Sequence, residues 1–193
     1  MKEFFISTEK EFDDFNSKNL NIIDFPFNDI LNSKGELVEK GLACSVSKNL
    51  KMNDDCFKTL LALSEFKKII PFTCSSFYRS EKHPLHDEKH PSQHFFTRAM
   101  DCRPAIKTMP FYIQFAKYAY EFYEKQDVKA FGGIGVYSTH VHLDTYKERT
   151  TPYWLGVINE IVKGGLVYRY IYFKNFNKMI ESLEIMIKEG DWQ

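Results

Sequence analysis

Histidine is the most common metal ligand among protein side chains, and the six histidines of this chain fall into two groups. The groups are His83, His86, His90 and His94, and then His140 and His142. Three members of the first group, at positions 86, 90 and 94, have a spacing that would line one face of a helix. Pro91 argues against that helix, because proline removes a hydrogen bond and clashes in a helix interior. A metal site on one helix face is therefore not expected.

His94 and Asp101 offer a different site. They are seven positions apart, which corresponds to about 23 Å in a straight strand and about 10 Å in a helix. Both distances are too long for a shared metal ion, whose bonds are about 2 Å. The two side chains can meet only if the chain turns between them and residues 98–102 form a strand that presents Asp101 back toward His94.

The second histidine group alternates with apolar residues. On a strand, His140, His142 and Asp144 project to one face, whereas Val141 and Leu143 project to the other. The alternation places two imidazoles and a carboxylate together above an apolar core. We expect the third ligand to come from this segment.

The rest of the sequence predicts helices and strands that intermix without a regular βαβ rhythm, which favours an α+β fold. Helices are expected at 53–67, 108–126, 155–163 and 176–188, and strands at 69–78, 98–103, 131–137, 141–146 and 166–173. Residues 80–93 are predicted to form a charged loop that contains two prolines. Residues 1–40 show only weak periodicity.

The chain has 193 residues, with 26 basic and 26 acidic side chains. A zero net charge argues against nucleic-acid binding by bulk electrostatics and against a polybasic membrane binder. No apolar run reaches the roughly 18 residues of a membrane span, and the first residues lack the apolar core of a signal peptide. We therefore expect synthesis in the cytoplasm. The cysteines are expected to be buried reduced thiols: Cys44, Cys56, Cys74 and Cys102.

Three motifs in this order resemble those of the zinc D-Ala-D-Ala peptidases, a group that includes VanX-type dipeptidases, D,D-carboxypeptidases and phage endolysins. Ser92, His94, Ala99 and Asp101 look like SxHxxGxAxD, and residues 76–80 resemble the preceding SGYRS segment. Downstream, residues 133–137 and 141–144 resemble the GxGxY and VHLD elements of the carboxypeptidase-like branch, and Trp154 matches its closing tryptophan. The resemblance spans residues 69–154.

The resemblance implies one zinc ion per chain, bound by His94, Asp101 and His142 with water in the fourth position. It implies a small central antiparallel sheet that carries the zinc site and is flanked by helices, as in hedgehog signalling domains. Zinc would lower the pKa of the bound water to about 7 and polarise the scissile carbonyl.

The remaining site residues follow from the same resemblance. VanX-like members have a glutamate where this chain has Thr139, so His140 is the first choice for the catalytic base or transition-state partner. Asp144 is the second choice, or it orients a neighbouring imidazole. Arg79 is expected to contact the substrate carbonyl or carboxylate. Ser92 and Tyr137 are expected to contact the substrate.

Two departures from the family pattern concern glycines. Phe77 and Thr97 stand where the family has glycine, and both resist a positive φ. We therefore expect the loop between the ligands to turn differently, or the site to be less well formed. His83, His86 and His90 match no family motif, and are expected to be solvated loop residues or a lip over the zinc.

Together these features predict a zinc peptidase-like domain over 1–154 and a C-terminal extension over 155–193 of unknown role. Its motif core is 69–154, with residues 1–68 packed on it. The expected activity is hydrolysis of peptidoglycan peptides, at the D-Ala-D-Ala end or in the stem peptide. The alternatives are an inactive zinc-bearing binding module and a virion component. We expect a monomer with no nucleic-acid or membrane partner, used in the cytoplasm, released during phage lysis or carried in a virion.

Overall fold

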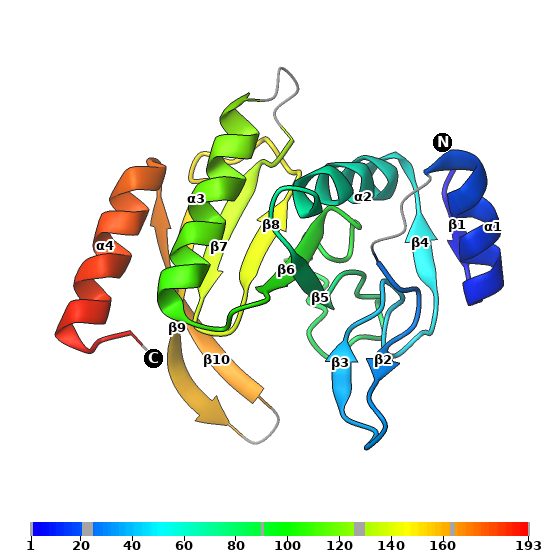
Figure 1. Ribbon diagram of the computed structural model, residues 1–193, viewed down its shortest axis with the longest axis horizontal. Coiled ribbons are helices and arrows are strands. Elements are labelled where there is room, and N and C mark those ends of the chain that lie inside the picture. Colours follow the sequence, from blue (N-terminus) through cyan, green and yellow to red (C-terminus); the bar gives the residue numbers. More distant parts are fainter. Residues whose placement is uncertain (1, 21–24, 90, 126–129, 163–164, 193) are drawn as a thin grey trace. The chain divides into compact units, whose positions relative to one another are not determined.

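A computed structural model describes residues 2–20, 25–89, 91–125, 130–162 and 165–192 (Figure 1). The chain divides into two compact units, Met1–Ala105 and Ile106–Gln193. Each unit contains both helices and strands, so the predicted α+β class is confirmed. Among the described residues, none of the helices combines the length and apolarity that a membrane crossing requires.

The first unit contains two helices and six strands in its described part. In chain order these are β1 (Phe4–Ile6), α1 (Glu9–Asn19), β2 (Ile30–Leu31), β3 (Leu37–Glu39), β4 (Leu50–Met52), α2 (Asp54–Lys67), β5 (Phe72–Ser76) and β6 (Ala99–Pro104). Strands β1 and β4, β2 and β3, and β5 and β6 form antiparallel pairs. The pair that matters for function is β5–β6, because β6 carries Asp101.

Helix α1 was not expected, because residues 1–40 have weak periodicity and Phe12 is its one buried residue in the described structure. A local signal does mark its start. Thr8 accepts a hydrogen bond from the backbone N–H of Glu11, and the Glu11 side chain accepts from the backbone N–H of Thr8. This capping box satisfies two backbone donors that the first turn leaves unpaired.

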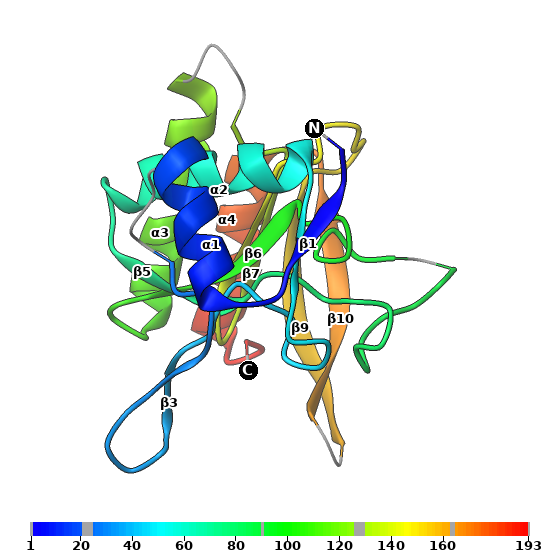
Figure 2. The ribbon, with the colours of Figure 1, turned by 90° about the vertical axis from the view of Figure 1, so that its right-hand side faces the viewer.

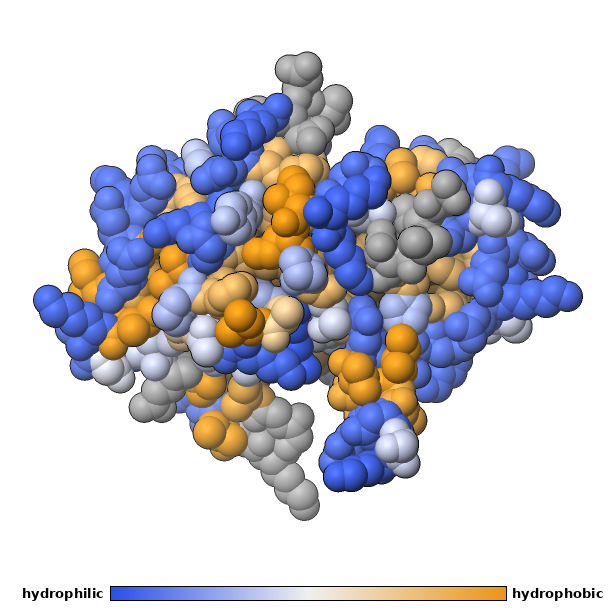
Figure 3. All heavy atoms as spheres, in the orientation of Figure 1, coloured by the Kyte–Doolittle hydropathy of each residue, from blue (hydrophilic) through white to orange (hydrophobic). Residues whose placement is uncertain are grey.

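The β2–β3 hairpin projects from the first unit, as Figure 2 shows. Its apolar side chains are exposed, and they form orange clusters in Figure 3: Ile30, Leu31, Leu37 and Val38. The core of the unit is formed elsewhere, by large side chains from α2, β5 and β6. These include Leu60, Leu63, Phe66, Phe72 and Met100.

The second unit contains a sheet with two helices packed against it. Its elements are α3 (Met109–Lys125), β7 (Gly133–Tyr137), β8 (Val141–Asp144), β9 (Tyr153–Val162), β10 (Gly165–Phe173) and α4 (Phe176–Glu189). The strands of this unit lie in the order β10-β9-β7-β8. Helix α3 packs against β7 and β8, and α4 packs against β9 and β10 (Figure 1).

The sheet of the second unit is mixed, so the expectation of a purely antiparallel sheet is wrong. Strands β7 and β8 are antiparallel, but β9 pairs in parallel with β7. Successive strands reverse direction, and β9 lies beside β7 rather than beside β8. The first and third of the three strands are therefore neighbours that run the same way.

The helix expected at 155–163 is also wrong, because residues 155–162 belong to strand β9 and residue 163 lies outside the described residues. Residues 153–157 are all buried, and a short continuous buried run of this kind is consistent with a strand that is covered on both faces. The β-branched residues of the segment favour a strand as well. The expected boundary between residues 154 and 155 falls inside β9.

Candidate metal centre

The segment between His94 and Asp101 folds into a turn, as their spacing requires. The backbone N–H of Phe95 donates to the carbonyl of Ser92 at 3.0 Å, and that of Thr97 donates to the carbonyl of His94 at 3.2 Å. The chain then enters β6, which carries Asp101. The turn thereby brings the side chains of His94 and Asp101 to the same side of the first unit.

Thr97 adopts φ 58° in this turn, so the expectation that it would avoid a positive φ is wrong. A β-branched residue with positive φ is strained, and it persists only where its surroundings hold it. Here the side chain is fully buried. Its Oγ1 lies 3.0 Å from Oδ1 of Asn53 and 2.6 Å from the carbonyl oxygen of Phe96. Phe77, the other replaced glycine, has no positive φ.

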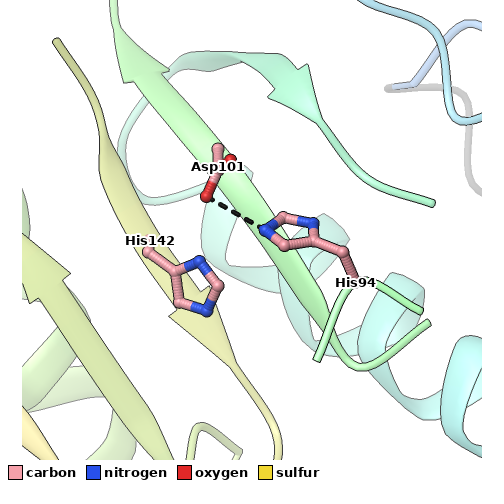
Figure 4. Close-up of side chains that lie close together, drawn as sticks. All are labelled: His94, Asp101 and His142. Carbon is pink, nitrogen blue, oxygen red and sulfur yellow. Dashed lines mark hydrogen bonds and ion pairs between the residues drawn. The ribbon is translucent and has the colours of Figure 1, made fainter. Parts of the chain in front are cut away.

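The first half-site consists of His94, Asp101 and Arg79. Nδ1 of His94 lies 2.7 Å from the carbonyl oxygen of Phe77, and its Nε2 lies 3.2 Å from Oδ1 of Asp101 (Figure 4). A carbonyl oxygen can only accept, so Nδ1 carries the proton. In the neutral ring, Nε2 then presents a lone pair to a carboxylate oxygen. A protonated ring would donate Nε2–H to Asp101, whereas the neutral ring leaves two acceptors facing each other, an arrangement compatible with a shared metal ion.

Arg79 supports the carboxylate of this half-site. Its guanidinium donates from Nη2 to Oδ2 of Asp101 at 2.8 Å and from Nε to Oγ of Ser76 at 3.1 Å. One oxygen of Asp101 therefore faces the arginine and the other faces His94. Arg79 contacts the candidate ligand itself, and this contact fixes the orientation of the carboxylate.

The second half-site consists of His142, Asp144 and Arg149. Nε2 of His142 lies 3.3 Å from Oδ2 of Asp144, and the same oxygen accepts from Nη2 of Arg149 at 2.7 Å. Oδ1 of Asp144 accepts the backbone N–H of Tyr146 at 3.0 Å. With its Nε2–H donated to a carboxylate, His142 has the lone pair of the neutral ring on Nδ1. Asp144 is fully buried and is occupied by these three donors.

Two glycines of the GxGxY segment make room for this half-site. A Cβ added to Gly133 would lie 2.8 Å from Oδ2 of Asp144, and one added to Gly135 would collide with the ring of Trp154. Trp154 lies flat over Gly135, with its ring centroid 5.2 Å from that of His142. The glycines therefore allow an aromatic ring and a carboxylate to approach the strand that neighbours the histidine.

His94, Asp101 and His142 form a buried group whose candidate ligand atoms all lie within 4.8 Å of one another (Figure 4). Two imidazoles and one carboxylate are compatible with a single metal ion. Each imidazole also has a fixed acceptor for the N–H of its second ring nitrogen. For His94 this is the Phe77 carbonyl, and for His142 it is the Asp144 carboxylate. Metal-binding histidines are oriented in this way.

His140 lies outside that group. Its Nδ1 is 2.9 Å from Oγ1 of Thr139, and its ring stacks on Tyr137 with centroids 4.2 Å apart and planes 15° apart. Tyr137 is buried, and its hydroxyl accepts from Nε1 of Trp154 at 3.0 Å. Tyr137 thus supports His140 and Trp154 through contacts that its sequence position alone does not reveal.

The remaining expected residues lie around the turn. Ser92 is half-buried and begins the turn through its carbonyl. His83 accepts the backbone N–H of Leu85, and burial, with Arg79 and Lys40 nearby, lowers its pKa. His86 packs against Phe95. His90 lies outside the described residues.

Two members of the site have no distinguishing signal in the sequence. Arg149 stands in a polar loop with no pattern that separates it from the other basic residues. The carbonyl of Phe77 is a backbone group, so the residue type at this position does not indicate its role. Neither role can be predicted from the sequence, because each depends on a partner that only the fold brings close.

Comparisons with protein-family models, with curated proteins and with solved structures found no match to this chain. The resemblance to the zinc D-Ala-D-Ala peptidases therefore stays a prediction. What the site does must be inferred from its own geometry.

Proposed function

We propose that this protein is a zinc-dependent peptidase that hydrolyses peptidoglycan peptides, at the D-Ala-D-Ala end or in the stem peptide. The observation that supports this most strongly is the buried group of His94, Asp101 and His142. Both imidazoles are oriented by an acceptor on their second nitrogen. A purely structural polar cluster does not need two lone pairs and a carboxylate oxygen directed at one another.

The donor set suits zinc better than a harder cation. Zinc accepts nitrogen and oxygen ligands, and three protein ligands are the usual number in a hydrolytic site, whereas calcium and magnesium prefer oxygen alone. When bound, zinc supplies an activated water near neutral pH and polarises a scissile carbonyl. The residues that would hold it are His94, Asp101 and His142.

We assign the base role to His140 rather than to Asp144. Asp144 is fully buried, and its two oxygens already accept from His142, Arg149 and the Tyr146 N–H. His140 is half-buried and is held by Thr139 and the Tyr137 ring. If Nδ1 donates to the threonine oxygen, Nε2 has the lone pair that can accept a proton and return it to the leaving amine.

Arg79 is assigned a positioning role through Asp101, because its guanidinium donates to that carboxylate. By holding one carboxylate oxygen, Arg79 directs the other toward His94. The substrate contacts expected of Ser92 and Tyr137 stay predictions.

A zinc-bearing binding module is the second candidate. Thr139, which stands where VanX-like enzymes have glutamate, contacts His140 and carries no carboxylate. A site without a functional base would bind a wall peptide and leave it intact.

Metal analysis and wall digestion test the proposal together. The purified protein should contain about one zinc per chain, and His94→Ala should lose it. His83→Ala, a change in the neighbouring loop, is the matched control and should keep it. Purified cell wall and D-Ala-D-Ala peptides are then incubated with the protein, with and without chelator. Absence of zinc would exclude the site assignment, and zinc without cleavage would leave the binding module.

A single substitution tests the base. His140→Ala should keep zinc and lower kcat by about 10²–10⁴-fold, which is the usual contribution of a positioned proton-transfer group. Full activity in this variant would show that another group takes the proton.

A further inference from the structure

The sheet of the second unit has two different faces. On one face, Tyr153 packs against Tyr120 and Phe176, which belong to α3 and α4. Neighbouring residues of a strand point to opposite faces. Trp154 and Gly156 therefore lie on the face away from these helices.

Strand β10 places three tyrosines on that second face. Tyr168, Tyr170 and Tyr172, here called the tyrosine row, lie opposite Ile158, Gly156 and Trp154 of β9. Residues directly opposite each other in an antiparallel pair share a face. The tyrosine row therefore shares its face with Trp154 and, through β7 and β8, with Tyr137 and His142.

The tyrosine row is continuous with the residues of the candidate site. The ring centroid of Tyr137 lies 4.2 Å from His140, 5.0 Å from Tyr168 and 6.3 Å from Tyr170. Tyr170 and Tyr172 are stacked at 6.2 Å. A Cβ on Gly156 would collide with the ring of Tyr137. An uninterrupted track of rings thus leads from His140 out along β10.

The outer part of this track is open to solvent. Tyr170 is 47% exposed and Tyr172 is 57% exposed, although both are large aromatic side chains. Strand β10 is also the end strand of its sheet. Tyr137 and Trp154 are buried on this face, but the exposed rings of Tyr170 and Tyr172 lie beyond them and are not needed for that packing.

We propose that the tyrosine row binds the glycan strand of peptidoglycan, and that the adjoining site acts on the peptide attached to it. This inference rests on the proposed function and names the part of the substrate beyond the scissile peptide. A pyranose ring has a flat apolar face of C–H groups that packs against the electron-rich face of an aromatic ring. The tyrosine hydroxyls can pair with sugar hydroxyl and acetamido groups.

Charge favours a glycan over a nucleic acid as the occupant. The side chains of the tyrosine row carry no charge, and the chain as a whole has a net charge of zero. Stacking of nucleobases on aromatic rings normally accompanies a positively charged groove for the phosphates. A largely uncharged polymer is the better match to uncharged rings with hydroxyl groups.

Binding to peptide-free glycan strands, measured in chelator, tests the inference without any catalysis. The wild type should bind, and the Tyr170→Ala/Tyr172→Ala double variant should bind roughly tenfold or more weakly, because each ring contributes to stacking. Tyr118→Ala removes an exposed tyrosine from α3 and should bind like the wild type. Tyr172→Ala alone, at the outermost ring, provides a second variant that disturbs the fold least.

Cleavage separates this inference from the proposed function. The double variant should lose about tenfold in activity on intact wall and keep its activity on a glycan-free stem peptide. If the wild type cuts no peptide, the proposed function is wrong. The inference about the tyrosine row is then still tested by glycan binding, which does not depend on cleavage. The inference is overturned if the wild type does not bind glycan strands, if the double variant binds them equally well, or if single-stranded DNA displaces them at lower concentration.

Discussion

The two half-sites contain the same three residue types and use them differently. Each joins a histidine, an aspartate and an arginine: His94, Asp101 and Arg79 in the first, and His142, Asp144 and Arg149 in the second. In the first, a backbone carbonyl takes the imidazole N–H, so the carboxylate faces the nitrogen with the lone pair. In the second, the carboxylate takes the N–H itself. Nε2 faces the carboxylate in both half-sites, so a candidate ligand is separated from an orienting group by whether another acceptor takes the proton on Nδ1.

The comparison predicts its largest effect at Asp101. Asp101→Asn keeps the shape of the side chain but removes the charged ligand, so zinc affinity should fall by more than about 100-fold, beyond the range for outer groups. Competition with a chromophoric chelator measures this. An affinity within tenfold of the wild type would remove Asp101 from the ligand set.

Asp144→Asn should have a smaller effect on zinc, about 10–100-fold, because the residue orients His142 without being a ligand. Its effect on folding should be larger than that of Asp101→Asn. Arg79 and Arg149 would each lose a carboxylate partner, but Asp144 is fully buried and both of its oxygens hold donors, so its substitution should cost about 3 kcal/mol. Urea denaturation of both variants measures the difference. Equal loss of zinc in the two variants would contradict the assignment of Asp101 as a ligand and Asp144 as an orienting group.

A pH-dependent contribution to folding stability is expected next to the first half-site and not next to the second. Cys44 contacts Ser80, the residue after Arg79. Burial opposes ionisation of this thiol, but hydrogen bonds from Ser47 and Ser80 outweigh burial and lower its pKa from 9.0 to about 7. A lowered pKa means that the thiolate stabilises the fold fully above pH 9, and that this stabilisation is lost as the pH falls through 7.

The wild type should therefore gain about 1–2 kcal/mol over Cys44→Ala between pH 6 and pH 9. Denaturation series at several pH values measure the gain. Cys56→Ala is the control, because burial raises the pKa of the Cys56 thiol and keeps it neutral over this range. A constant difference between wild type and Cys44→Ala would contradict the lowered pKa.

The smallest predicted effect concerns the turn that only the first half-site contains. At most buried positions glycine is less stable than alanine, but at φ 58° the order should reverse. Thr97→Gly should be more stable than Thr97→Ala by about 1 kcal/mol, because alanine keeps the strained φ. Thermal unfolding of the two variants measures this. An alanine variant that is more stable than the glycine variant would show that the turn has relaxed.

Much of the first half-site could be predicted from the sequence because its constraints are local. The spacing of His94 and Asp101 already required a turn between them. In the second half-site the alternation of residues 140–144 is local as well, but burial does not distinguish its two faces, because all four residues of β8 are buried.

The parts that could not be predicted depend on long-range partners. Arg149 becomes specific only when it meets Asp144. Strand β9 was expected as a helix, because Leu155 and Ile158 also fit a helical spacing and its partners β7 and β10 are set by the sheet. Helix α1 is different, since Thr8 and Glu11 carry a local capping signal that periodicity overlooks.

One shared acceptor connects helix α2 to the turn between His94 and Asp101, here called the ligand turn. Oδ1 of Asn53 accepts the backbone N–H of Cys56 at the start of α2, and it also lies 3.0 Å from the hydroxyl of Thr97. Arg98 adds a 2.7 Å hydrogen bond to Asp55 in the same helical turn. We therefore expect the first turn of α2 and the ligand turn to open to solvent as one cooperative unit. Hydrogen exchange at the Cys56 amide should then report how firmly His94 is held, without any probe placed at the candidate site.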